Sequence, residues 1–489
     1  MPAVTQKSAL EAAPTQLYIG GEWLDSASGQ TFTVHDPATG RTIAEVADGT
    51  IADGRAALDA AVAAQADWAK VPPRERSELL RSAFELINER AETFAMLMTL
   101  EMGKPLAEAR GEVKYGNEFF RWFAEEAVRI HGRYAVAPDG ATRLVTTKQP
   151  VGPTFAITPW NFPLAMGTRK IGPALAAGCT VVLKPAAQTP LTSLLLAEVL
   201  HEVGVPAGVV NVFITSRSGA TTGPIIADPR LRKLTFTGST EVGRALLAQA
   251  SGTILRTSME LGGNAPFVVL PSADVERAIE GAVLAKMRNI GEACTAANRF
   301  IVHRSVAEQF TAGLAARLGA MAVGDGLADG SQVGPLINAD ALANVSSLVE
   351  EAVADGARVV TGGGRASGAG SGHFMQPTVL ADVAPTSRVV REEIFGPVAP
   401  VLVYDDVEEA IALANDTEFG LIAYVFGENM GEAIRVAEAL QSGMVGLNSG
   451  VISNPAAPFG GVKASGLGRE GGFEGIEEYL ETKYIGLSL

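Results

Sequence analysis

From Val151 onward, the chain alternates short apolar runs with segments of helical periodicity, and this alternation constrains the fold more than any other feature. Four apolar runs are predicted strands: 154–157, 180–183, 209–213 and 233–237. Helical patterns, such as 163–177 and 240–250, lie between them. Strands that alternate with helices form a parallel sheet through right-handed crossovers. Such a sheet binds ligands beyond the carboxyl ends of its strands.

A second cycle of strands and helices begins after Glu260, which therefore marks a predicted domain boundary. It comprises a strand at 265–270, a helix at 274–290, a strand at 300–303, a helix at 305–318, a strand at 358–361, a strand at 398–404 and a helix at 407–415. A chain of 489 residues exceeds one compact core and suggests two or three domains. The predicted class is α/β.

Charge and composition exclude several classes of function. The net charge of −15 repels phosphate backbones, so a nucleic-acid partner is not expected. No apolar run approaches the roughly 18 residues that span a bilayer, and residues 1–16 do not resemble a signal peptide. We therefore expect a cytoplasmic protein without a membrane partner. The five histidines and two cysteines lack the spacing of a metal site or a disulfide framework.

The two cysteines stand in different surroundings. Cys294 follows Gly291 in a predicted turn and precedes the polar pair Asn298 and Arg299, whereas Cys179 lies in an apolar run. A thiolate in a polar turn can attack a carbonyl group. The alternative, a cysteine that serves as a small buried hydrophobe, fits Cys179 better.

Glu260 ends an apolar run and is followed by Gly262 and Gly263. A carboxylate at this edge of a sheet lies where ligands bind. If it is partly buried and its pKa is raised, it suits a base that activates water for thioester hydrolysis. Taken alone, the residue is better explained as a glutamate in a salt bridge or a helix cap.

Polar residues also follow the other predicted strands. Asn161, between two prolines, could donate its amide to an oxyanion, although asparagine is also common in rigid turns. Gly238 and Gly243 flank a strand-to-helix turn that could approach a pyrophosphate, or be an ordinary turn. Lys184 ends the second strand with no acidic residue before Glu198, which suits a ribose 2′-phosphate or a surface lysine.

Together these motifs resemble the aldehyde dehydrogenase superfamily from Tyr18 to the C-terminus. The specific segments are Met-Glu-Leu-Gly-Gly at 259–263, the cysteine segment at 289–295, Glu-Glu-Ile-Phe-Gly-Pro at 392–397 and Pro-Phe-Gly-Gly at 458–461. The resemblance implies that Cys294 is the nucleophile, that Asn161 and the Cys294 backbone N–H form the oxyanion hole, and that Glu260 is the base.

The resemblance also implies a nicotinamide dinucleotide cofactor and its contacts. These are Trp160, Lys184, Ala187, Gly238, Ser239, Glu393 and Phe395, with Lys184 and Glu393 at the riboses and Phe395 beside the nicotinamide ring. Ala187 replaces a glutamate found in many NAD-preferring members. We therefore expect NADP to be preferred, with NAD as the alternative.

The fold implied is a Rossmann-type cofactor domain, an α/β catalytic domain and a small β oligomerisation arm. The expected bounds are 1–130 and 151–258 for the cofactor domain, 259–462 for the catalytic domain, and 131–150 and 463–489 for the oligomerisation segments. Members of the superfamily are dimers or tetramers, so a homodimer or homotetramer is expected.

Within the superfamily, the segment 165–173 resembles succinate-semialdehyde dehydrogenases. Arg169, Arg288 and Ser453 match the positions that hold the substrate carboxylate in that group, although both arginines could instead form internal salt bridges. Ala296 replaces a second cysteine that many members carry. The alternatives are a dehydrogenase of glutarate semialdehyde or another ω-carboxy aldehyde, a coenzyme A-acylating relative, which would not need Glu260, and a catalytically silent structural protein.

Overall fold

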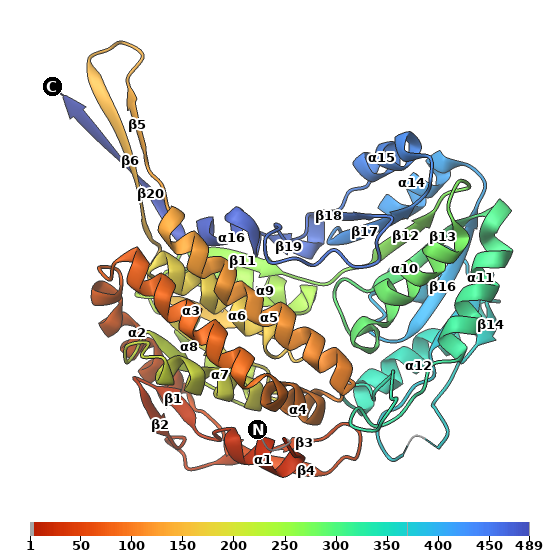
Figure 1. The fold of residues 1–489 in the computed structure, drawn as a ribbon, viewed down its shortest axis with the longest axis horizontal. Coiled ribbons are helices and arrows are strands. Elements are labelled where there is room, and N and C mark those ends of the chain that lie inside the picture. The colour runs from red at the N-terminus through yellow and green to blue at the C-terminus, as the bar shows by residue number, and fades with distance from the viewer. Residues whose placement is uncertain (1–3, 369, 489) are drawn as a thin grey trace.

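The computed structural model describes residues 4–368 and 370–488, which form two α/β lobes and a projecting β arm (Figure 1). Within the described residues, no helix is long and apolar enough to cross a membrane. The α/β class predicted from the sequence is confirmed.

The first lobe is built on an eight-stranded sheet in the order β19-β11-β10-β7-β8-β9-β1-β2. Its central strands are parallel, and β19, β1 and β2 pair antiparallel at its edges. The strand order reverses between β10 and β7, which creates a switch point where ligands bind in open α/β sheets. The strands are β1 (Leu17–Ile19), β2 (Glu22–Leu24), β7 (Thr154–Ile157), β8 (Val181–Lys184), β9 (Val210–Val212), β10 (Lys233–Thr237), β11 (Arg256–Glu260) and β19 (Gly466–Leu467).

Helices of the first lobe share one large buried apolar cluster with this sheet. They are α1 (Gln6–Ala12), α2 (Ile51–Trp68), α3 (Pro73–Glu89), α4 (Ala91–Met102), α5 (Leu106–Glu126), α6 (Ala165–Ala177), α7 (Leu191–Glu202), α8 (Ser218–Ile226) and α9 (Thr240–Ala250). A hairpin of β3 (Thr31–His35) and β4 (Thr42–Ala47) lies at the base of the lobe. Gly178 ends α6 in the left-handed conformation, with φ +89°, as a glycine C-cap does.

The second lobe contains a seven-stranded sheet in the order β14-β15-β16-β13-β12-β17-β18, parallel except between β14 and β15. Its strands are β12 (Ala265–Val269), β13 (Ala297–His303), β14 (Arg358–Thr361), β15 (Thr378–Ala381), β16 (Val398–Tyr404), β17 (Ile422–Phe426) and β18 (Met444–Leu447). Its helices are α10 (Val275–Met287), α11 (Arg304–Gly319), α12 (Ala339–Ala354), α13 (Arg388–Arg391), α14 (Val407–Asn415) and α15 (Met430–Ala439).

The helix predicted over 274–290 is shorter in the structure, because α10 ends at Met287. Asn289 and Ile290 then adopt φ values of +54° and +64°, which no right-handed helix accommodates. The apolar periodicity continued through Ile290 because that side chain is buried in the same core from outside the helix.

Only residues 261–264 separate β11 from β12. The carboxyl ends of β7, β10 and β11 therefore meet the amino ends of β12, β13 and β16 along a seam between the two sheets. Residues that follow strands of the first sheet and residues that precede strands of the second come together at this seam.

The projecting arm is a three-stranded antiparallel sheet of β5 (Arg133–Val136), β6 (Thr142–Pro150) and β20 (Leu480–Ser488) (Figure 1). The predicted C-terminal oligomerisation segment, 463–489, divides between two places. Its first part returns to the body, where β19 pairs with β11 and α16 (Gly472–Glu477) packs near α6. Within the described residues of that segment, only β20 joins the arm.

Candidate active site

A cavity of about 240 Å³ lies at the seam between the two sheets. Its lining brings together eight residues that the sequence placed in one site: Trp160, Asn161, Gly238, Ser239, Glu260, Cys294, Glu393 and Phe395. The first four follow β7 and β10, Glu260 ends β11, and the last three precede β13 and β16. The seam thus explains why residues more than two hundred positions apart share one cavity.

Cys294 lies at the end of a tight turn that begins at Arg288. Asn289, Ile290 and Gly291 have positive φ values in succession, which reverses the chain after α10. At Gly291 a side chain is excluded, because a Cβ atom there would lie 2.4 Å from the carbonyl oxygen of Gly396. The backbone of this turn is therefore fixed by steric contact as well as by hydrogen bonds.

Asn161 connects the first sheet to this turn. Its side-chain Nδ2 donates to the backbone carbonyl oxygen of Glu292 at 2.9 Å, and its backbone carbonyl oxygen accepts from Nδ2 of Asn289 at 3.0 Å. The same carbonyl accepts from Nζ of Lys104 at 2.8 Å, and Lys104 is held by a buried ion pair with Glu112. A side-chain amide has two N–H donors, and within the described residues the second N–H of Asn161, a residue that lines the cavity, has no acceptor.

The Cys294 side chain is half-buried, and its surroundings favour the protonated thiol. The pKa of the thiol is raised to about 12, chiefly by burial; Glu393 and Glu260 act in the same direction, and Arg169 and Arg288 act against it. Cys179 lies in the core, as its apolar surroundings predicted. Its side chain is fully buried and its thiol donates to the carbonyl oxygen of Tyr479 at 3.3 Å.

Glu260 is buried, and within the described residues neither of its carboxylate oxygens has a hydrogen-bond partner. Burial, followed by the nearby Glu470, raises its pKa well above the usual range. Gly460 must lack a side chain, because a Cβ atom there would lie 2.9 Å from Oε1 of Glu260. The Pro-Phe-Gly-Gly motif at 458–461 therefore packs directly against this carboxyl group.

Arg169 lies in an internal ion pair rather than on the wall of the cavity at Cys294. Its Nη2 is 2.6 Å from Oε2 of Glu470, and its guanidinium stacks 4.0 Å from the ring of Phe459. Nζ of Lys170 contacts the other oxygen of Glu470 at 2.5 Å, and the two cations hold the pKa of Glu470 below its usual range. A role for Arg169 in substrate binding stays a prediction.

The remaining lining residues suit a dinucleotide. Trp160 and Phe395 meet edge to face at 5.5 Å, and Ser239 caps α9 by accepting the backbone N–H of Val242. Thr237 Oγ1 is buried in the cavity wall and has no hydrogen-bond partner within the described residues. Glu393 accepts the Gly263 N–H at 3.1 Å, and burial raises its pKa to about 7.

Two predicted cofactor residues lie outside this cavity. Lys184 is buried at the end of β8, where burial lowers its pKa to about 8. Ala187 is half-buried and lines a separate cavity of about 420 Å³ together with Gln188. Their contacts with a cofactor stay predictions.

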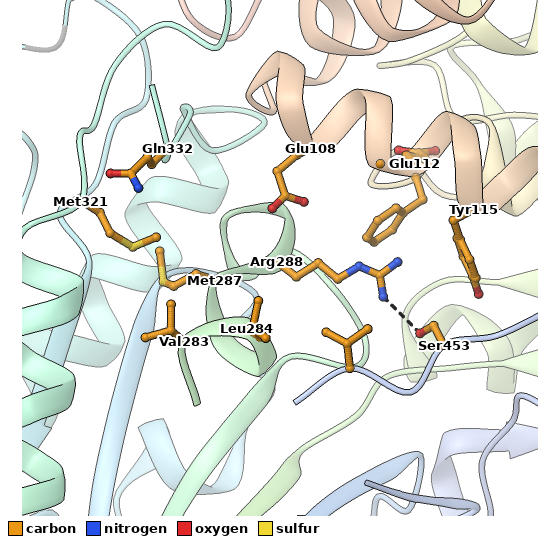
Figure 2. A pocket seen from close by; sticks show the side chains of 13 residues that line it. Glu108, Glu112, Tyr115, Val283, Leu284, Met287, Arg288, Met321, Gln332 and Ser453 are labelled. Atoms are coloured by element: carbon orange, nitrogen blue, oxygen red, sulfur yellow. Dashed lines mark hydrogen bonds between the residues drawn. The ribbon is translucent and has the colours of Figure 1, made fainter. Parts of the chain in front are cut away.

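A further cavity of about 370 Å³ contains two of the predicted substrate residues (Figure 2). Nη1 of Arg288 donates to Oγ of Ser453 at 3.1 Å. The guanidinium lies 5.3 Å from the ring of Tyr115 and 5.1 Å from the ring of Phe162, which fixes its position. Phe162 directly follows Asn161, so consecutive residues line the two cavities.

The sequence assigned no role to Lys104, Glu112, Asn289 or Glu470, whose side chains form hydrogen bonds or ion pairs around the site. The available signal was weak: Asn289 appeared only as a member of the cysteine segment, and each of the other three is a polar residue next to a glycine. Burial reveals them, since all four side chains are nearly inaccessible. Within the described residues, no group of three or more histidine, cysteine or acidic side chains is arranged to hold a metal.

Comparison with known proteins agrees with this geometry. The model of the aldehyde dehydrogenase family matches residues 23–485. The chain belongs to this family. A solved structure described as an NADP-dependent enzyme of Escherichia coli superposes with a TM-score of 0.96 at 49% identity, covering 98% of this chain and 99% of that one. The fold is therefore the aldehyde dehydrogenase fold.

Two relatives from bacteria carry names at the level of substrate. The chain is 58% identical to a succinate-semialdehyde dehydrogenase of Paenarthrobacter nicotinovorans, over 91% of this chain and 99% of that protein. It is 50% identical to a glutarate-semialdehyde dehydrogenase of Pseudomonas putida, over 97% of this chain and 98% of that protein.

The raised pKa of Cys294 predicts how this thiol reacts in the cofactor-free enzyme. Because the thiolate is the reactive form, alkylation by iodoacetamide should be slow at pH 7 and accelerate about tenfold per pH unit up to about pH 10. Mass spectrometry of the labelled peptides measures the rate, and the fully buried Cys179 should remain unlabelled. A rate at Cys294 that is constant between pH 7 and 9 would contradict the assignment of a protonated thiol.

Proposed function

We propose that this enzyme oxidises an aldehyde with a distal carboxylate, succinate semialdehyde foremost, to the corresponding acid, using NADP or NAD. The observation that carries the substrate assignment is the guanidinium of Arg288, fixed by Ser453 and two aromatic rings in a cavity beside the one that contains Cys294. Arginine suits a carboxylate because its planar guanidinium can form two parallel hydrogen bonds and stays charged.

The chemistry begins at Cys294. Once the Cys294 thiol has given up its proton to hydroxide from solution, its sulfur forms a bond with the aldehyde carbon, and the carbonyl oxygen becomes an oxyanion. The free N–H of Asn161 and the backbone N–H of Cys294 are the donors proposed for this oxyanion. Since the Asn161 amide is already held by Glu292, it needs no reorganisation when the charge develops.

The residues that line the cavity at the seam between the two sheets, hereafter the seam cavity, fit a nicotinamide dinucleotide. Thr237 Oγ1 lacks a partner within the described residues, the N-terminus of α9 opens beside Gly238, and Glu393 offers a carboxylate to ribose hydroxyls. When bound, the cofactor accepts the hydride that leaves the tetrahedral carbon, which converts the adduct on Cys294 to a thioester. Trp160 and Phe395 provide the aromatic walls of this cavity.

Glu260 is the proposed general base for hydrolysis of the thioester. As the carboxylate, it takes a proton from water, the resulting hydroxide adds to the thioester carbon, and the acid leaves as the Cys294 sulfur is released. Because the pKa of Glu260 is raised, the carboxylate fraction increases with pH, and this step accelerates as pH rises through that pKa.

Glutarate semialdehyde is the second candidate substrate, since its distal carboxylate could reach the same arginine and a relative at 50% identity bears that name. A silent structural protein is disfavoured, because Cys294, Glu260 and Asn161 line one cavity. We further propose a homodimer or homotetramer joined through the arm, whose residues Tyr134 and Tyr484 are exposed on its surface.

Glu260→Gln should lower steady-state turnover by roughly 10²- to 10⁴-fold, the usual contribution of a positioned base. Rapid mixing should still show a burst of reduced cofactor at 340 nm, because the first half-reaction does not need this base. Turnover close to that of the unaltered enzyme, or loss of the burst together with turnover, would show that Glu260 acts otherwise.

Arg288→Leu should raise KM for succinate semialdehyde strongly and change the oxidation of butanal little. Only succinate semialdehyde carries a carboxylate, and that carboxylate would lose its arginine partner. Arg277→Leu is the matched control, since Arg277 is exposed on α10 in an ion pair with Glu428. Equal losses for both aldehydes, or equal efficiency with both in the unaltered enzyme, would refute the carboxylate site.

Ala187→Glu should shift preference from NADP toward NAD by roughly ten- to a hundredfold, the value of one charged contact of about 1.5–3 kcal/mol. The ratio of kcat/KM for the two cofactors measures it. Gln188→Glu adds the same charge at the next residue and should have a smaller effect. No change, or a shift toward NADP, would mean that the 2′-phosphate lies elsewhere.

A further inference from the structure

The first turns of α5 line the cavity of about 370 Å³ that contains Arg288 and Ser453, hereafter the substrate cavity. Glu108, Glu112 and Tyr115 lie at helical spacing on the same face and all contribute to its lining. The two carboxylates on this wall differ in their surroundings, and this difference bears on which anions the cavity accepts.

Glu112 is fully occupied by structural contacts. It forms the buried ion pair with Lys104, and its Oε1 accepts the backbone N–H groups of Leu164 and Ala165 at 3.0 and 3.1 Å. Its negative charge is therefore neutralised locally and serves to anchor the start of α6.

Glu108 has no such contacts. It is half-buried, and within the described residues it forms neither a hydrogen bond nor an ion pair. Figure 2 shows its carboxylate directed from α5 toward the side chain of Arg288. A glutamate in the first turn of a helix also interacts favourably with the helix dipole, but that role does not require it to face a substrate cavity.

The positions of the two charges follow from their packing. The guanidinium of Arg288 lies over the rings of Tyr115 and Phe162, and these rings pack against Ala293 and Ala296 on either side of Cys294. Glu108 lies about two helical turns before Tyr115 on α5, so it is farther along the cavity from Cys294 than the guanidinium is. Leu284, Met287 and Met321, which also line the cavity, offer no cation to Glu108. Its charge also acts on the buried Lys104, but Lys104 is already paired with Glu112.

We propose that Glu108 is a specificity-determining residue that limits the length of anionic substrates by repelling a carboxylate that extends past Arg288. This inference rests on the proposed function and narrows its substrate class. A carboxylate two methylenes from the aldehyde carbon stops at Arg288. One that is three or four methylenes away approaches Glu108 and meets a like charge.

The experiment compares Glu108→Gln with the unaltered enzyme on succinate, glutarate and adipate semialdehydes and on the neutral butanal and pentanal. The variant should raise kcat/KM for glutarate and adipate semialdehydes relative to succinate semialdehyde by roughly five- to tenfold, as removal of a like charge at close range allows. Oxidation of butanal and pentanal should change by less than about twofold, because these substrates carry no charge.

Three controls separate repulsion from a structural effect. Glu108→Asp keeps the charge and should keep the discrimination. Glu308→Gln removes the same charge from the exposed surface of α11 and should change nothing. At about 1 M salt, where the Debye length falls to about 3 Å, the unaltered enzyme should approach the chain-length ratio of Glu108→Gln.

The inference fails if Glu108→Gln leaves the chain-length ratio unchanged, or if Glu108→Asp alters it as much as Glu108→Gln does. The proposed function fails by a different result, namely an unaltered enzyme that oxidises butanal and pentanal as efficiently as the semialdehydes. The two failures are therefore distinguishable in one set of measurements.

Discussion

The hydrogen bonds between Asn161 and the turn at 288–294 are the interaction on which the rest of the site depends. They join a loop that follows β7 of one sheet to a turn that precedes β13 of the other. The same turn begins with Arg288, in the cavity that Ser453 also lines, and ends with Cys294, in the cavity at the seam. One rigid segment therefore sets the separation between the group proposed to hold the carboxylate and the group proposed to attack the aldehyde.

The two sheets meet closely enough that glycine is required at their junction. A Cβ atom at Gly263 would lie 2.6 Å from the carbonyl oxygen of Cys294, and one at Gly262 would lie 2.8 Å from Glu393. The Gly-Gly pair at 262–263 thus has a steric basis: it lets the chain after β11 pass directly beside Cys294. Burial at this junction also raises the pKa values of Glu260, Glu393 and Cys294, so it favours the uncharged form of each of these groups.

Periodicity sufficed to place elements whose side chains pack in regular patterns. The strand at 154–157 and the helix at 240–250 have the predicted bounds. Periodicity predicted the wrong end for the helix at 274–290, because the buried Ile290 continues the helical pattern although its backbone is no longer helical. Partners distant in sequence, such as Glu470 beside Arg169, are fixed only by tertiary packing. Family resemblance placed Arg288 and Ser453 in one cavity, but no pattern could show that Arg169 lies in an internal ion pair.

The most direct test of this account is a crystal structure of Cys294→Ala with NADP and succinate semialdehyde bound. The substrate carboxylate should contact the guanidinium of Arg288 and the hydroxyl of Ser453, while the aldehyde oxygen lies within hydrogen-bond distance of Asn161 Nδ2. A carboxylate bound away from Arg288, or an aldehyde oxygen turned away from Asn161, would contradict the claim that the turn at 288–294 positions both ends of the substrate.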